Sequence, residues 1–204
     1  MTKNYYSIYI AAVLSFVISL PPRFAYALIG ILLLNLLIYS GLGLKLLMNF
    51  LKVEQFTSVI LLFTATVFTI LFKMILNICA PVVALNCGFA IYLITFSSYL
   101  MGNLLDTLGA EQTDHLKRTA IRVSTFSVIT LLFFLLRDII AYGTITLPAK
   151  YGLKILQVFT PGTEYFGHFL ATIPGSLIVL GLVFCLFAYI NHKFTILRRA
   201  ENER

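Results

Sequence analysis

The chain alternates between long apolar stretches and short segments that are polar or rich in glycine and proline. A transmembrane helix needs roughly 20 predominantly apolar residues to cross about 30 Å of hydrocarbon. Six stretches qualify, the first of them short, and each predicts a membrane-spanning helix. Their bounds are 6–20, 24–40, 56–76, 78–102, 119–142 and 168–189.

Proline and glycine residues end or interrupt several of these predicted spans. Two prolines after Leu20 end the first span, because proline lacks the backbone N–H that helix continuation requires. Gly41 and Gly43 are expected to close the second span, and Pro81 and Gly88 interrupt the fourth. Segment 45–55 is expected to be an amphipathic or polar connector, and segment 106–118 a polar connector.

The composition agrees with membrane insertion. Hydrophobic residues make up 60% of the 204 positions and charged residues 11%, and the mean hydropathy is +0.96. A soluble globular chain is about half apolar and about a quarter charged. These values exclude a soluble enzyme, a disordered chain and a secreted disulfide scaffold. The net charge of +7 comes from Lys and Arg at the ends of the apolar stretches, so it does not indicate a nucleic-acid partner.

Charge also predicts the orientation of the chain. With six spans, both termini lie on one side of the membrane, which would carry ten Lys and Arg residues against five on the other side. Excess positive charge stays cytoplasmic, so we expect cytoplasmic N- and C-termini. The ten are Lys3, Lys45, Lys52, Lys117, Arg118, Arg122, Lys193, Arg198, Arg199 and Arg204, and the five are Arg23, Lys73, Arg137, Lys150 and Lys154.

The six spans divide into two halves of three, residues 1–77 and 78–192, followed by a charged tail at 193–204. An odd number of spans in each half forces the halves into opposite orientations, which defines an inverted repeat. The sequence therefore predicts an all-α polytopic membrane protein of six transmembrane helices, built as two inverted three-helix repeats. Such proteins often place their function near the midplane, where broken helices meet.

The segment from Pro81 to Gly88 is the most specific candidate for chemistry. It holds Asn86 and Cys87 between a proline that frees a carbonyl and a glycine that permits a helix break. A thiolate in this setting can ligate iron or another soft metal. The alternative is that Cys87 is a small apolar residue packed between helices, as most buried cysteines are.

Arg137 and Asp138 form a second candidate near the end of the fifth span. Adjacent opposite charges there can pair across an interface or hold a loop against a neighbouring helix. The alternatives are a snorkelling pair at the membrane surface and a proton relay. Phosphate-binding glycine loops and the motifs HExxH, CxxC and GxSxG are absent from the sequence.

The run Pro-x-x-x-x-Asn-Cys that ends at Cys87 resembles the membrane subunits shared by the Rnf electron transport complex and the sodium-translocating NADH:quinone reductase. Further segments agree in order and spacing with the D/E-type subunits of this family. They are Leu136 to Ile140 followed by Gly143 and Thr144, Ile173 to Gly175, Leu180 to Leu182, and the basic tail from Arg198 to Glu201. The resemblance covers the chain from Pro81 to the C-terminus.

This resemblance implies a subunit of an ion-translocating electron transport complex in the lipid of the bacterial inner membrane. Each such subunit pairs with a paralogue, works beside the other subunits of the complex and contributes two cysteines, one per half, to a 2Fe-2S cluster. Cys87 matches the ligand of the second half. The chain would be at most a non-catalytic subunit of an ion-coupled oxidoreductase.

The first half departs from the family pattern. Ser15 stands where the resemblance places the other cysteine, and serine is a poor iron ligand compared with thiolate. Two alternatives therefore stand beside the electron transport subunit. One is a cluster-free structural subunit of a membrane complex, and the other is a small secondary transporter that uses the broken helices as a substrate site.

Overall fold

The protein is mostly helical in the computed structural model, which describes residues 20–51, 56–97, 112–149, 152–159 and 168–182, together with Cys185, Tyr189 and Lys193. The long helices are α2 (Phe24–Phe50), α3 (Thr57–Cys79) and α7 (Gln112–Tyr142). The short helices are α4 (Pro81–Cys87), α5 (Ala90–Thr95) and α8 (His168–Ala171). The strands are β1 (Thr144–Ala149) and β2 (Gly152–Gln157).

Among the described residues, three helical segments are long and apolar enough to cross a membrane. They are Phe24–Met48, Thr57–Cys79 and Thr119–Tyr142. These segments confirm the predicted second, third and fifth spans as long apolar helices. The helices are those expected of a membrane-embedded protein.

The second span is longer than the sequence pattern predicts. α2 continues through Gly41 and Gly43 and includes Lys45, which the pattern assigned to a polar connector. A glycine inside a helix costs only about 1 kcal/mol relative to alanine, and a helix in lipid must keep its backbone groups paired. The helix therefore runs on past both glycines. α7 likewise begins at Gln112, inside the other predicted connector.

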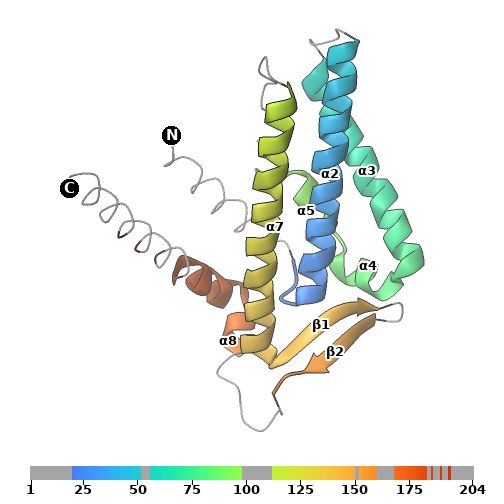
Figure 1. Ribbon diagram of the computed structural model, residues 1–204. Coiled ribbons are helices and arrows are strands. Elements are labelled where there is room, and N and C mark those ends of the chain that lie inside the picture. The colour runs from blue at the N-terminus through green and yellow to red at the C-terminus, as the bar shows by residue number, and fades with distance from the viewer. Residues whose placement is uncertain are drawn as a thin grey trace, which may run out of the picture.

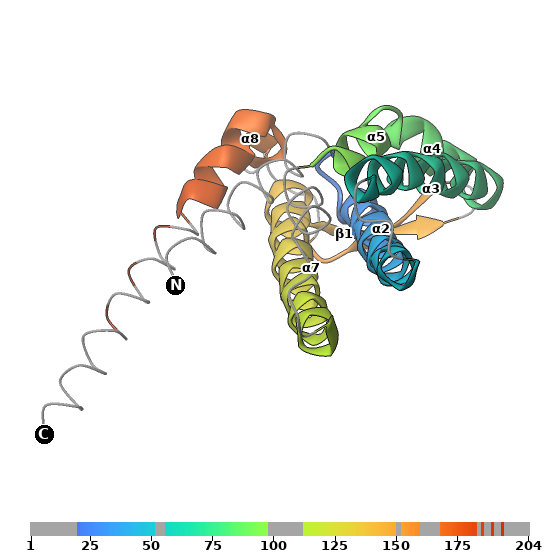
Figure 2. The same cartoon turned by 90° about the horizontal axis from the view of Figure 1, so that it is seen from above.

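α2 is the central helix of the bundle and runs antiparallel to both α3 and α7 (Figures 1 and 2). In the membrane-spanning windows, 56% of the α2 residues are buried, against 22% for α3 and 39% for α7. Asn35 links α2 to α7, because its Nδ2 donates a hydrogen bond to Ser127 Oγ at 3.1 Å. α3 packs at the periphery and leaves most of its apolar surface uncovered by the described residues.

The segment predicted as the fourth span is broken into short helices. Pro81 occupies the first position of α4, where its missing N–H costs no hydrogen bond. Gly88 ends α4 with φ +44°, a left-handed conformation that glycine adopts without a Cβ clash. α5 then packs against α2 and α3 (Figure 1). The breaks predicted at Pro81 and Gly88 are confirmed, whereas Ile78 belongs to α3 rather than to a new span.

A β-hairpin follows α7, in the segment between the predicted fifth and sixth spans, to which the sequence pattern assigned no strand. Its strands are antiparallel, with Thr144 opposite Gln157 and Ala149 opposite Gly152. β1 begins with a run of Thr and Ile, whose β-branched side chains favour strands, and Gly143 ends α7 with φ +65°. The hairpin lies across the end of the bundle where α2 begins and α7 ends (Figure 1). The prediction of an all-α fold is therefore wrong for this segment.

The remaining predicted spans are described in part. Of the first span, residues 6–20, only Leu20 is among the described residues. The sixth starts with α8 and, after a break at Thr172, continues as the apolar helix Ile173–Leu182, whose described length is too short to cross a membrane. The division into two inverted halves and a charged tail stays a prediction.

Candidate functional site

The candidate residues come from the end of α4 and the last turns of α7, on the side of the bundle that carries the hairpin (Figure 1). Ser15, the expected counterpart of Cys87 in the first half, lies outside the described residues. Two groups of side chains lie at this end of the bundle. One is a buried polar network around Asp138, and the other is a cavity lined by Cys87 and Arg137.

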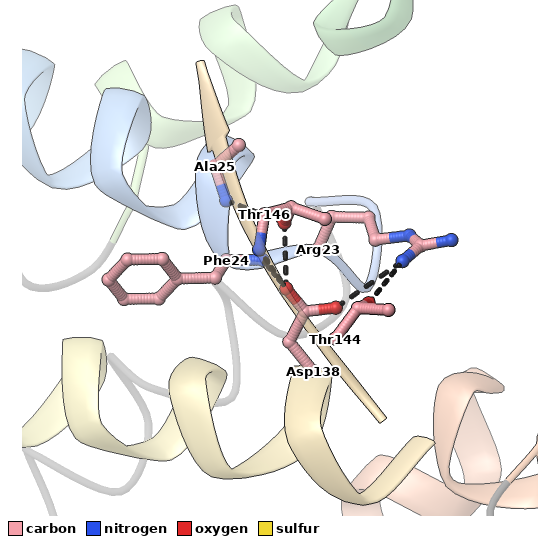
Figure 3. A network of polar contacts seen from close by, with 6 residues as sticks. All are labelled: Arg23, Phe24, Ala25, Asp138, Thr144 and Thr146. Atoms are coloured by element: carbon pink, nitrogen blue, oxygen red, sulfur yellow. Dashed lines mark hydrogen bonds and ion pairs between the residues drawn. The ribbon is translucent and has the colours of Figure 1, made fainter. Parts of the chain in front are cut away.

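Asp138 is fully buried and joins α7 to β1 and to the start of α2 (Figure 3). Its Oδ2 accepts hydrogen bonds from the Thr146 backbone N–H at 2.9 Å, the Thr146 hydroxyl at 2.7 Å and the Phe24 backbone N–H at 3.4 Å. The Thr146 hydroxyl accepts in turn from the Ala25 backbone N–H at 3.3 Å. The first N–H groups of a helix lack partners within it, so Asp138 and Thr146 cap α2 from outside. The carboxylate also favours the positive end of the helix dipole.

Arg23 supplies the positive charge of this network (Figure 3). Its Nη1 lies 3.5 Å from Asp138 Oδ1 and donates to Thr144 Oγ1 at 3.1 Å. Its guanidinium also lies 3.6 Å from the ring centre of Tyr142. Asp138 Oδ1 receives no hydrogen bond from the described residues, so the ion pair with Arg23 balances its charge there. The network is a charge-neutral connection between the start of α2, the end of α7 and the hairpin.

Arg137, next to Asp138 in sequence, contacts a different neighbour. It is 4% exposed, and its Nε and Nη2 donate to the backbone carbonyls of Leu170 and Ala171 at 3.3 and 2.8 Å. Its Nη1 is buried and has no hydrogen-bond partner among the described residues. Successive residues of an α-helix point about 100° apart. Asp138 therefore holds the hairpin while Arg137 holds α8.

Cys87 is the last residue of α4 and is 2% exposed. The left-handed turn at Gly88 follows it directly, and the sulfur belongs to the buried core rather than to the outer surface. Asn86 Nδ2 donates to the hydroxyl of Tyr26 in α2 at 2.8 Å, which ties the helix break to the central helix. The other two cysteines of the chain are exposed.

A cavity of about 400 Å³ lies where the helix break meets the last turns of α7 and the start of the sixth predicted span. Its polar wall comes from Asn86 and Arg137, and Cys87 contributes a thiol. The rest of the wall is mainly apolar and includes Leu93 and Ile173. The cavity therefore combines an apolar interior with one buried cation.

The described residues do not form a metal centre by themselves. No group of three or more His, Cys, Asp or Glu side chains gathers among them. A 2Fe-2S cluster is ordinarily held by four cysteines. Of the described residues, Cys87 is the one buried thiol, so the further ligands would have to come from a partner or from elsewhere in the chain.

The apolar helices and the buried polar end together define a membrane-embedded, mostly helical protein. Comparison with models of protein families, with curated proteins and with solved structures finds no match to the chain. Function is therefore inferred from the geometry of the site and from the motifs of the second half.

The sequence pattern singled out Asp138 of the polar network and Asn86, Cys87 and Arg137 of the cavity wall, but it did not indicate that Arg23, Thr146 and Tyr26 contact them. Arg23 follows two prolines at the start of an apolar span, which is a signal for a helix start that needs a cap. Thr146 carries no comparable signal, because its role depends on a hairpin that the pattern does not predict. Tyr26 is one of several aromatic residues in apolar helices, and only its distance to Asn86 distinguishes it.

Proposed function

We propose that the protein is a membrane subunit of an Rnf/Nqr-like, ion-translocating electron transport complex, in which it helps form the transmembrane electron path with a paralogous subunit. The observation that carries this proposal is the environment of Cys87, a buried thiol at a left-handed helix break on the wall of a cavity. A cysteine that only fills space between helices needs neither the break nor the cavity. The order of the motifs after Pro81 supports the same family.

Cys87 is the residue that would hold the cofactor, a 2Fe-2S cluster shared with the paralogous subunit. When bound, such a cluster accepts and passes on single electrons. The hydrogen bond from Asn86 to Tyr26 holds the helix end that carries the thiol.

Iron content of the complex, purified with its partner subunits, tests the proposal. Cys87→Ala should remove iron and the visible absorbance of the cluster. Cys79→Ala is the matched control, because Cys79 is exposed at the end of α3 and should leave both signals unchanged. A Cys87→Ala complex that keeps its full iron content refutes the ligand assignment.

A cluster-free structural subunit is the second candidate function. Ser15 in place of the expected cysteine favours it, as does the single buried thiol among the described residues. Ser15→Cys separates the two functions: a gain of iron supports an electron path that has lost a ligand, whereas intact assembly without iron supports a scaffold. Uptake of a solute by the reconstituted chain alone would instead indicate a secondary transporter.

The proposed location is the bacterial inner membrane, with both termini in the cytoplasm. This orientation puts the hairpin end of the bundle on the outer side. Ile155 in β2 is 54% exposed, so Ile155→Cys in a Cys79→Ala/Cys185→Ala background, which removes the two exposed native thiols, should react with a membrane-impermeant maleimide in cells whose inner membrane is intact. Labelling only after the inner membrane is permeabilised refutes the orientation.

A further inference from the structure

Arg137 carries a buried charge that the described residues do not balance. Its side chain is 4% exposed, and two of its three guanidinium nitrogens bond to neutral carbonyls. Nη1 is left without an acceptor. Of the acidic side chains in the sequence, the structure describes only Asp138, which is already paired with Arg23. An unsatisfied buried charged donor is costly, so this site favours an anionic acceptor.

The cavity beside Arg137 has the size and lining of a ligand site. Its volume of about 400 Å³ falls within the range of roughly 300–1,000 Å³ that is typical of small-molecule pockets. Its walls are mainly apolar, with side chains such as Leu20, Leu93 and Ile173. An anion with an attached apolar body fits this lining better than a fully hydrated ion.

The depth of Arg137 points to the same class of ligand. Arg137 lies five residues before Tyr142, the end of the span, which is about 7.5 Å along a helix axis. This position is close to the boundary between hydrocarbon and head groups, where lipid phosphates lie. Basic pockets between transmembrane helices on the cytoplasmic side of membranes bind anionic lipid head groups, and a buried arginine at head-group depth offers the same donor chemistry in either leaflet.

We propose that this cavity binds the phosphate of an anionic phospholipid, with Arg137 Nη1 as the donor and the apolar walls covering the upper part of an acyl chain. The inference invokes no redox group and does not rest on the proposed function. Cys87 and Arg137 come from different helices of the cavity wall. Each residue can therefore be tested separately.

Tryptophan fluorescence provides the assay, because the chain contains no Trp. Leu93→Trp places the single reporter in the cavity wall. Ile75→Trp places a matched reporter on the exposed face of α3, where the Ile75 side chain is 60% exposed. Each protein is reconstituted with phosphatidylglycerol or phosphatidylcholine whose acyl chains are brominated, so that a bound lipid quenches the reporter. An adjacent cation favours an anionic lipid over a zwitterionic one by about 1 kcal/mol, which corresponds to a fivefold preference in binding.

We expect phosphatidylglycerol to quench Leu93→Trp at an about fivefold lower mole fraction than phosphatidylcholine, and Ile75→Trp to show no preference. Arg137→Gln should abolish the preference at the cavity reporter, and Arg137→Lys, which keeps the charge, should retain it. Lys73→Gln is the charge control, because Lys73 lies over the ring of Tyr92 and does not line the cavity.

Three results would overturn the proposal. Equal quenching by both lipids at Leu93→Trp shows that the cavity does not select an anion. Glu164 precedes α8 by four residues in the sequence and lies outside the described residues, and a lipid preference that appears only in Glu164→Gln identifies it as an internal counter-ion. Displacement of phosphatidylglycerol by inorganic phosphate shows that the ligand is a free anion. Cys87→Ala should leave the lipid preference intact, so failure of the iron experiment and failure of this one are distinguishable.

Discussion

Asp138 offers the sharpest test of how the fold is held together. Its carboxylate is fully buried, accepts three hydrogen bonds and pairs with Arg23. Asp138→Ala removes all of these contacts at once and leaves the partially buried guanidinium and two backbone N–H groups without their acceptor. The variant therefore tests whether a single side chain connects α2, α7 and the hairpin.

The expected loss in the free energy of unfolding follows from the contacts that each variant removes. Hydrogen bonds to a charged group contribute roughly 1.5–3 kcal/mol each, but not additively. Removing one partner of a buried ion pair costs about 3–5 kcal/mol, and we expect Asp138→Ala to fall in this range. Asp138→Asn keeps one oxygen for Thr146 but loses the charge beside Arg23, so we expect a smaller loss of about 1.5–3 kcal/mol.

Unfolding in mixed detergent micelles measures these losses. In a Cys79→Ala/Cys185→Ala background, Cys87 is the remaining thiol and is buried, so its reaction with a maleimide dye reports unfolding as denaturing detergent is added. Thr125→Ala is the control on the same helix, because its exposed hydroxyl donates a hydrogen bond to the carbonyl of Ile121 within that helix. We expect the control to stay within about 0.5 kcal/mol of the parent protein. If the free energy of unfolding of Asp138→Ala is also within this margin of the parent, Asp138 does not hold α2, α7 and the hairpin together.

Three further predictions concern the backbone and the helix contacts. Gly175→Ala should strongly disrupt folding, because a Cβ there would collide with the backbone carbonyl of Phe169 and lie 2.9 Å from Leu170 Cα in α8, whereas Gly181→Ala, with nothing within 4 Å, should be tolerated in the same detergent unfolding assay. Gly88→Ala should cost about 1–2 kcal/mol, since φ is +44° and alanine rarely adopts this conformation. A double-mutant cycle of Asn35→Ala and Ser127→Ala should give a coupling of about 0.6 kcal/mol, the average for hydrogen bonds between membrane helices. A coupling near zero would show that the two residues meet without stabilising the bundle.

The sequence predicted the features that depend on neighbouring residues. Apolar length located three of the spans, and the breaks at Pro81 and Gly88 followed from the backbone chemistry of proline and glycine. The same reasoning failed at Gly41 and Gly43, because the cost of a glycine is small beside the cost of leaving backbone groups unpaired in lipid.

The candidate site was predicted only in part for a related reason. Asp138 and Arg137 stood out as charges in an apolar helix, but nothing local assigned one to the hairpin and the other to α8. Their partners lie far along the chain, as with Phe24, which is 114 residues from Asp138. The hairpin was not predicted, because the sequence pattern of a short strand of Thr and Ile is hard to distinguish from that of an apolar loop.

The sequence by itself determined that this is a membrane-embedded, mostly helical protein and where its helices break, because transfer into lipid and backbone preference are properties of consecutive residues. Only the tertiary structure decided that Asp138 caps α2, that Cys87 is buried in the core rather than exposed, and that Arg137 lines a cavity. These outcomes depend on which distant segments pack together. Packing is decided by the summed free energy of many contacts, which no single segment of the chain contains.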